Sequence, residues 1–404
     1  MSQERGAAQL ESANAIRAYQ REWIKAVRER VDKGEPFAIC NGDEFEEIFN
    51  IMDIPVIVIN YWNSIISVKG MMEYYLDILG KRGYEPNYFA LGLASTMDNK
   101  PDTAPWGGLP KPAIIIGGTK NDMEMRVLET WAREYGCPFV PLEFGLDAVP
   151  EQGIPPRWWE KLKDHWDDII DPRKLDLRVA EEEALISFLE VITGHTFSSA
   201  KLGQALELIN EQMEYWGKAR DLIAETIPCP VSLRDQLAVY QAMWHRGTPK
   251  GLDFIKSYYE EVKDRVDKGV AAWPGEKLRL MWMAGTPPRW ARYAEEKYDA
   301  VCVCSMFSSI PIDSYPRTII NNDPMRTLAS RHMILFMETP EWRLKDARLH
   351  QCDGVVEAVR PSAPSFNEPV FDEAGMPFCV IPGDRDDEEV RSVLSDFIEK
   401  RLLT

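Results

Sequence analysis

The 404-residue sequence has no long apolar run and is short of positive charge. No stretch reaches the roughly 18 apolar residues that cross a bilayer, and the charged N-terminal segment lacks the apolar core of a secretory signal. Lysine and arginine number 47 against 65 aspartates and glutamates, which gives a formal net charge of -18. A surface of that sign repels phosphate backbones and anionic lipids. We therefore expect neither nucleic acid nor a membrane as a partner.

Cysteine and histidine are also sparse. The seven cysteines lack the paired spacing of secreted proteins, which predicts a reducing, cytoplasmic location. The five histidines show no metal-ligand spacing, so structural roles are the simpler interpretation. Cys302 and Cys304 lie two apart on an expected strand, where they would share a face and could hold a metal. Their valine neighbours favour the alternative, small buried apolar side chains.

Apolar periodicity predicts an α/β protein with two doubly wound, parallel-sheet lobes of Rossmann or flavodoxin type. In the first lobe, residues 35–155, we expect strands at 36–40, 55–60, 113–117 and 139–142, with helices at 44–52 and 122–135. In the second lobe, residues 273–404, we expect strands at 278–283, 300–304, 354–359 and 378–381, with helices at 288–297, 340–349 and 387–402. A chain of this length is expected to form two or three lobes.

Two further segments are expected to be helical. Residues 1–34 form an N-terminal helical segment, and residues 156–272 contain long charged helices with little strand signal. Ser198 or Ser199 is expected to cap the helix that begins near Lys201.

Ligands of open parallel sheets bind beyond the carboxyl ends of the strands. Trp62, Asn63 and Ser64 follow the second expected strand, in what we expect to be a loop lining a ligand cleft. Gly118 and Thr119 follow the third strand and open a helix, where backbone N–H groups can bind an anion. These five residues are predicted to contact substrate.

The second lobe is expected to contribute Arg360 and Ser365, from the loop after its third strand, to the same substrate site. The sequence has 13 tryptophans, and large aromatic residues outside regular elements often line a cleft or a subunit interface. Ordinary core packing of these tryptophans remains the alternative. No phosphate-loop lysine motif, nucleophile elbow or GxGxxG motif is present.

Three segments together carry a family resemblance. They are GEPFAICNGDEFEEIFNIMDIPVIVINYW, EKLRLMWMAGTPPRWARYAEEKYDAVCVCS and NNDPMRTLAS, in that order along the chain. Each resembles a segment of the subunits of 2-hydroxyacyl-CoA dehydratases and benzoyl-CoA reductases. Asp43 and Glu44 stand where the family has a proline-glutamate pair, and Met325 takes a leucine position. The resemblance covers nearly the whole chain and implies the two-lobed α/β fold.

In that family three short motifs each supply one thiolate to a [4Fe-4S] cluster. The corresponding positions here hold Ala90, Asn121 and Ala363, none of which provides a thiolate. The resemblance therefore implies a chain with no metal and no cofactor of its own. Because the three ligands must reach one cluster, we expect the vacated positions to lie together, with Asn121, Asp122, Arg360, Ser362 and Ser365 converging around them.

The resemblance also implies a reaction and a partner. In the family an ATP-driven activator injects one electron through clusters into an acyl-CoA thioester, and a ketyl radical expels a hydroxyl group or an aromatic ring is reduced. A homologous partner subunit would then hold the [4Fe-4S] cluster, in a heterodimer or a dimer of heterodimers. This chain would shape the acyl-CoA cavity.

Two alternatives stay open at this point. The chain could be a non-redox hydratase or lyase acting on acyl-CoA, with Asn121, Asp122 and Ser362 as catalytic acid–base candidates. It could instead be a purely structural partner of the catalytic subunit.

Overall fold

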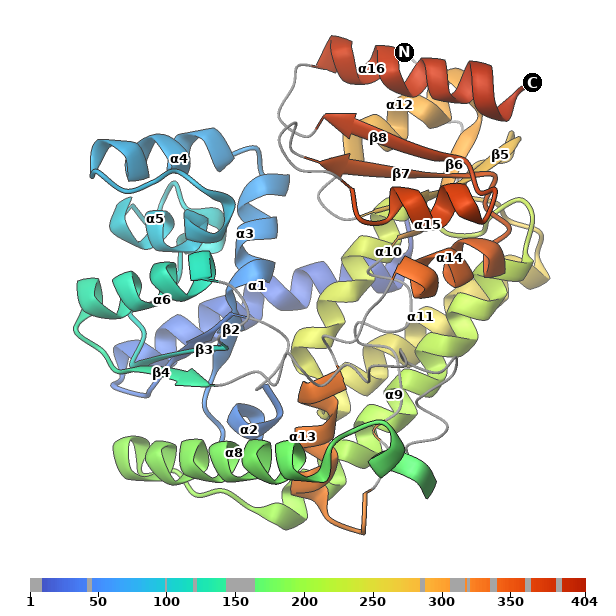
Figure 1. The fold of residues 1–404 in the computed structure, drawn as a ribbon. Helices are drawn as coiled ribbons and strands as arrows, with labels where there is room; N and C mark the ends of the chain where they lie inside the picture. Colours follow the sequence, from blue (N-terminus) through green and yellow to red (C-terminus); the bar gives the residue numbers. More distant parts are fainter. Residues whose placement is uncertain are drawn as a thin grey trace.

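The computed structural model describes residues 9–41, 46–98, 100–118, 122–142, 164–283, 288–305, 317, 320–334, 340–359, 365–382 and 387–404. Figure 1 shows two α/β lobes that stand side by side, with long helices below and between them. Each lobe contains a four-stranded sheet in which every pair of neighbouring strands is parallel. The α/β class and the two parallel sheets expected from the sequence are thus confirmed.

The first sheet has the strand order β2-β1-β3-β4. Its strands are β1 (Ala38–Cys40), β2 (Val56–Val58), β3 (Ile114–Gly118) and β4 (Phe139–Leu142). β1, β2 and β3 are buried along their whole length, as expected for strands covered on both faces. The helices of this lobe are α2 (Glu46–Ile51), α3 (Ile59–Val68), α4 (Met72–Lys81), α5 (Leu91–Asp98) and α6 (Asp122–Tyr135), with the 3-10 turns η1 (Tyr88–Ala90) and η2 (Pro105–Gly107).

The second sheet has the order β6-β5-β7-β8, so its strands follow the same spatial order as those of the first sheet. They are β5 (Leu278–Trp282), β6 (Ala300–Ser305), β7 (Gly354–Val359) and β8 (Phe378–Pro382). In Figure 1, α12 (Pro288–Tyr298) and α16 (Asp387–Phe397) lie on one face, and α14 (Pro340–Leu349) and α15 (Glu368–Glu373) on the other. The expected final helix changes to π-helical geometry over Ile398–Leu402.

The remaining helices are α1 (Glu11–Asp32), α8 (Pro172–Thr193), α9 (Ser199–Glu225), α10 (Leu233–Tyr240), α11 (Pro249–Asp267) and α13 (Pro324–Ile334), with the 3-10 turn η5 (Gln241–His245). The hydroxyl of Ser198 accepts the N–H of Lys201 and caps α9, as predicted. Asp171 caps α8 in the same way, and Gly194 ends it with a φ of 72°. None of the described helices is long and apolar enough to cross a bilayer.

A bulge in β6 separates the two cysteines that were expected to share a face. Leu280 of β5 pairs with Cys302, but its neighbour Met281 pairs with Cys304, so Val303 is an extra residue. Since successive residues of β5 face opposite sides, the bulge turns the two thiols to opposite faces. The expected shared face is therefore wrong, and both thiols are fully buried, as in the apolar alternative.

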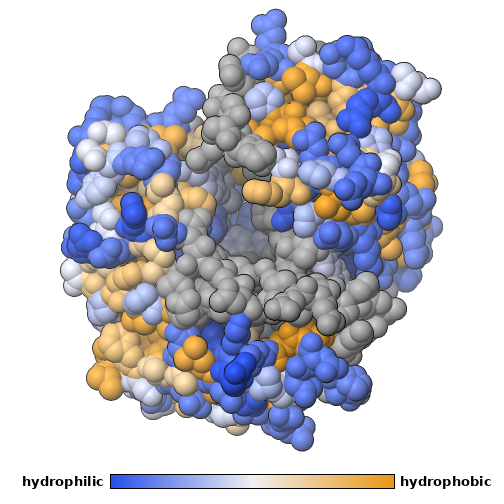
Figure 2. Space-filling view, viewed as in Figure 1, coloured by the Kyte–Doolittle hydropathy of each residue, from blue (hydrophilic) through white to orange (hydrophobic). Residues whose placement is uncertain are grey.

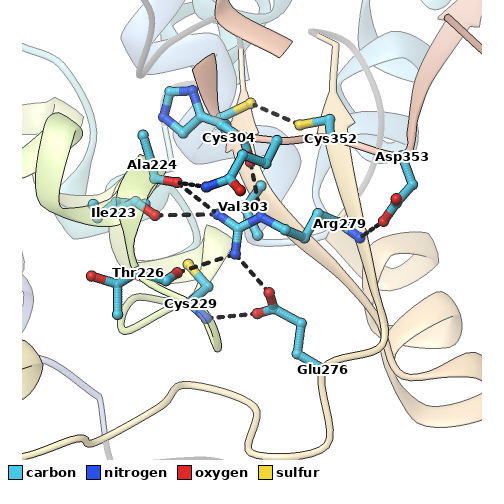
Figure 3. A network of polar contacts seen from close by, with 12 residues as sticks. Ile223, Ala224, Thr226, Cys229, Glu276, Arg279, Val303, Cys304, Cys352 and Asp353 are labelled. Atoms are coloured by element: carbon cyan, nitrogen blue, oxygen red, sulfur yellow. Dashed lines mark hydrogen bonds and ion pairs between the residues drawn. The ribbon is translucent and has the colours of Figure 1, made fainter. Parts of the chain in front are cut away.

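Arg279 joins the second sheet to the end of α9 (Figure 3). Its guanidinium donates to the carbonyls of Thr226 at 3.1 Å and Ile223 at 3.3 Å, at the C-terminus of that helix, and to the carboxylate of Glu276 at 2.6 Å. Only 4% of Arg279 is exposed. A buried cation at the negative end of a helix fixes how the second lobe sits on the helices below it.

Candidate functional site

The carboxyl ends of both sheets point toward the space between the lobes in Figure 1, and Figure 2 shows that the surface is hollowed there. In both sheets the strand order reverses beside the first strand of the lobe, between β1 and β3 and between β5 and β7. Ligands of doubly wound sheets bind at that reversal, outside the carboxyl ends of the strands. The edge where β1 and β3 end is the candidate site.

Asn41, which directly follows β1, ties the two strand ends together. Its side-chain oxygen accepts the backbone N–H of Gly118 at 3.1 Å, and its side-chain amide donates to the carboxylate of Glu124 at 3.2 Å. Asn41 is fully buried and Glu124 is 4% exposed. The predicted residue Gly118 therefore lies at this edge, but its N–H is bonded to Asn41.

Asn60, the second residue of α3, extends the network. Its amide donates to the backbone oxygen of Asn41 at 2.9 Å and to Glu124 at 3.3 Å. Its side-chain oxygen is buried and has no hydrogen-bond partner among the described residues. Because an unsatisfied buried acceptor costs roughly 1–3 kcal/mol, this oxygen is suited to accept a hydrogen bond from a ligand.

Ser64 and Tyr88 form the outer part of the same network. The Ser64 hydroxyl donates to the backbone oxygen of Asn60 at 2.9 Å and lies 3.0 Å from the Tyr88 hydroxyl. Burial raises the pKa of Tyr88, so the phenol stays protonated at neutral pH. The edge thus presents hydroxyls and amides beside one buried carboxylate.

The expected loop over Trp62, Asn63 and Ser64 is helical, because β2 ends at Val58 and α3 begins at the next residue. Trp62 is fully buried and donates its indole N–H to Ser95 at 3.1 Å. Asn63 accepts the N–H of Gly92 at 2.9 Å and donates to the carbonyl of Phe89 at 3.2 Å. Trp62 and Asn63 thus hold the turn around Ala90 in place, and Ser64 alone of the three is exposed.

Of the three positions predicted to be vacated ligand positions, Ala90 is the one among the described residues, and it is 2% exposed. It ends η1, which packs against α3 and α6. α6 begins at the exposed Asp122, directly after Asn121. The turn that carries Ala90 therefore packs against the helix that follows Asn121. Asn121 itself lies outside the described residues.

Other predicted site residues are placed only in part. Thr119, Arg360, Ser362 and Ala363 lie outside the described residues, so their convergence stays a prediction. Ser365 is described: its hydroxyl accepts the N–H groups of Asn367 and Glu368, both at 3.1 Å, and bonds the carboxylate of Glu357. It holds the start of α15.

A second set of acidic residues was not predicted. Glu46 and Glu47, in the first turn of α2, are each 1% exposed. Glu46 pairs with Arg246 at 3.0 Å, and Glu47 lies 3.7 Å from Arg317. The acidic pair expected at Asp43 and Glu44 lies outside the described residues.

Glu182 of α8 belongs to the same group of buried ionisable side chains. Burial raises the pKa of its carboxyl to about 8, against the opposing effect of Arg178 at 3.1 Å. The negative charge of Glu47 contributes to that rise, which places α2 close to α8. The sequence shows that Glu46 and Glu47 follow soon after a buried strand. Their burial could not be predicted from that position, because it depends on helices far along the chain.

Two buried histidines, His245 and His350, have structural surroundings. His245 packs edge-on against Tyr19 and Trp23, and a ring nitrogen of His350 lies 2.9 Å from the carbonyl of Asp346. Burial lowers the pKa of both imidazoles to about 4, so they are neutral at pH 7. In the described part of the chain, no three His, Cys, Asp or Glu side chains are grouped to hold a metal.

Comparison with known proteins identifies related sequences. The sequence model of the family described as "2-hydroxyglutaryl-CoA dehydratase, D-component" matches residues 46–400. The chain is also similar to the (R)-2-hydroxyisocaproyl-CoA dehydratase alpha subunit of Clostridioides difficile, with 27% identity over 123 residues. That alignment covers 30% of this chain and 30% of the relative. The resemblance drawn from the sequence motifs is confirmed by the family match.

Proposed function

The chain belongs to the 2-hydroxyglutaryl-CoA dehydratase D-component family, and from this premise we propose that it is a cluster-free subunit of a 2-hydroxyacyl-CoA dehydratase-like or benzoyl-CoA reductase-like enzyme. It shapes the acyl-CoA cavity and pairs with a homologous subunit that carries a [4Fe-4S] cluster. One sequence feature carries the proposal: the resemblance aligns Ala90, Asn121 and Ala363 with the family's cysteine positions, and none of the three provides a thiolate.

The donors at the candidate site support this assignment. A [4Fe-4S] cluster is normally held by four thiolates, whereas Asn41, Asn60 and Glu124 offer amide and carboxylate groups, which suit harder cations. Cys40, at the end of β1, is a single buried thiol. The described residues at this edge therefore do not fit an iron–sulfur cluster, and the one-electron step is assigned to the partner.

The polar edge supports a role in binding substrate. The unpaired, buried oxygen of Asn60 is suited to accept an N–H donor, such as an amide of the pantetheine arm of CoA. The Ser64 hydroxyl and the protonated Tyr88 phenol lie at the outer side of the same network. Polar groups placed at fixed points of a largely apolar cavity are typical of ligand sites.

A second candidate function is a non-redox acyl-CoA hydratase or lyase. The buried carboxylate of Glu124 favours it, because a carboxylate between two amide donors at a strand edge is positioned for acid–base work. Asn121, Asp122 and Ser362 are further candidates in that reaction. A purely structural subunit would need none of these groups.

Anaerobic co-purification separates the candidates. The tagged full chain is expressed together with its homologous neighbour subunit, and colour, iron and acyl-CoA dehydration are measured. A brown active complex whose iron stays with the neighbour after the chains are separated is the expected result. A colourless chain that is active alone would support the lyase. If the brown neighbour subunit is equally active with and without this chain, the result would support a structural role.

A further inference from the structure

The structural feature that carries a further inference is the outer face of α8, which lies along the lower edge of the molecule (Figure 1). The inner face of this 22-residue helix buries Leu175, Leu185, Ile186 and Leu189. A helix that packs on one side normally presents polar residues on the other. Beside the exposed polar residues Asp176, Glu183, Ser187 and Glu190, the outer face of α8 carries large apolar side chains: Val191 is 84% exposed, Leu177 57% and Ile192 40%.

The exposed apolar residues form a continuous stripe. Leu177, Ala184 and Val191 follow one another at seven-residue steps, and Ala180 and Phe188 lie between them. Both alanines are exposed, whereas Phe188 is half-buried and packs partly against the core. A seven-residue apolar repeat is the spacing that a second helix needs to pack alongside. Figure 2 shows hydrophobic side chains gathered over the end of α8 that includes Val191.

An acidic row borders this stripe. Asp176, Glu183 and Glu190 precede Leu177, Ala184 and Val191 by one residue each, so they repeat with the same seven-residue step. Two of these carboxylates have local partners: Asp176 pairs with Arg326 of α13, and Glu190 accepts the N–H of Phe197. In paired helices, the charged residues beside the apolar stripe determine which partner helix binds.

We propose that the outer face of α8 is the surface on which a partner subunit docks, through a helix with an apolar seam and lysine or arginine at its flanks. The existence of a partner rests on the proposed function. Charge complementarity identifies the kind of helix, since the acidic row attracts a basic flank. A second copy of this chain is the poorer occupant, because it carries the same net charge of -18 and in an antiparallel helix pair its acidic row would face the first.

The position of α8 fits this role. Leu177 and Val191 are 14 residues apart, which is about 21 Å along a helix, enough for several layers of side chains. One helix face is smaller than the roughly 800 Å² per partner of a standard interface, so α8 supplies the anchor of a wider contact.

The test uses the full chain, tagged and co-expressed anaerobically with its homologous neighbour subunit, with iron per tagged chain as the readout. The double variant Leu177→Glu/Val191→Glu places two charges on the stripe and is expected to lower co-purified iron at least about tenfold, as for residues central to an interface. Val68→Glu is the matched control, because Val68 is 79% exposed on α3. It is expected to leave the iron content unchanged. Both variants should keep the circular dichroism spectrum and melting temperature of the wild-type chain.

Charge reversal provides an independent arm. Glu183→Lys/Glu190→Lys is expected to slow association and to weaken its dependence on salt. Retention of iron by the Leu177→Glu/Val191→Glu variant would overturn the docking surface and leave the proposed function standing. Failure of the wild-type chain to recover any iron-bearing homologue would overturn both. Sedimentation tests the remaining occupant. If the wild-type chain forms a homodimer and this variant does not, a second copy is the occupant and the proposal is overturned.

Discussion

Arg279→Met is expected to loosen the second lobe from the helices beneath it. The guanidinium of Arg279 donates to Glu276 at 2.6 Å, to the carbonyl of His350 at 2.8 Å and to that of Thr226 at 3.1 Å (Figure 3). The side chain of Glu276 is 1% exposed. Methionine would fill the space but leave several helix-end carbonyls without their donor. The buried carboxylate of Glu276 would keep the backbone N–H of Cys229 as its donor and lose its positive partner.

The size of the effect follows from this burial. Removing one member of a buried ion pair typically costs about 3–5 kcal/mol, because the remaining charge stays in a low dielectric. The double variant Arg279→Met/Glu276→Gln removes that stranded charge and should recover part of the loss, which measures the coupling directly. Lys263→Met is the control: Lys263 is half exposed and pairs with Asp267 on the same helix, and such pairs contribute about 0.3–0.5 kcal/mol.

Urea unfolding followed by tryptophan fluorescence provides the free energies, and hydrogen exchange at the amides of β5 locates the loss. We expect faster exchange in β5 and β7 with little change in the first sheet. A loss below about 1 kcal/mol in Arg279→Met, or equal losses in the single and double variants, would refute the assignment of Arg279 as the link between the second sheet and α9.

Two further outcomes follow from buried groups. The pKa of Glu182 rises from 4.5 to about 8 on folding, so the folded state binds the extra proton and stability should fall between pH 4.5 and 8, by up to about 1.4 kcal/mol per pH unit. Glu182→Gln should flatten that slope in urea unfolding, and equal slopes would contradict the buried neutral carboxyl. Of the seven cysteines, Cys137 is the one that is not buried, so iodoacetamide should label it first in the native protein. Rapid native labelling of Cys304, whose burial raises its pKa well above the usual value, would contradict the packing of β6.

Local pattern was sufficient to predict most of the regular elements. The helix expected at 122–135 and the strand expected at 139–142 have the predicted bounds. The helix has an amphipathic period and ends before Gly136, and the strand is a short apolar run between Pro138 and Glu143. The stretch 55–60 was less well predicted: β2 ends at Val58 and α3 takes the next residues. A continuous apolar run does not distinguish a strand from the buried first turn of a helix.

The site depended on contacts that no local pattern records. Asn41, Asn60 and Glu124 come from three separate segments, and the strand order brings them together. Their polarity gave no signal, since asparagine and glutamate near a strand end are common. The bulge at Val303 was likewise invisible, because only the pairing of β6 with β5 reveals the extra residue. The assignment of Ala90, Asn121 and Ala363 to the family's cysteine positions rests on the motifs alone and stays a prediction.

Iron and acid-labile sulfide analysis of the isolated full chain, after anaerobic reconstitution and with electron paramagnetic resonance of the reduced sample, tests the central claim most directly. With alanine or asparagine at all three motif positions, the chain should hold well under one iron per polypeptide and give no cluster signal. The co-purified neighbour subunit, treated in parallel, should hold about four iron atoms. About four iron and four sulfide per isolated chain would contradict the assignment of this protein as the cluster-free subunit.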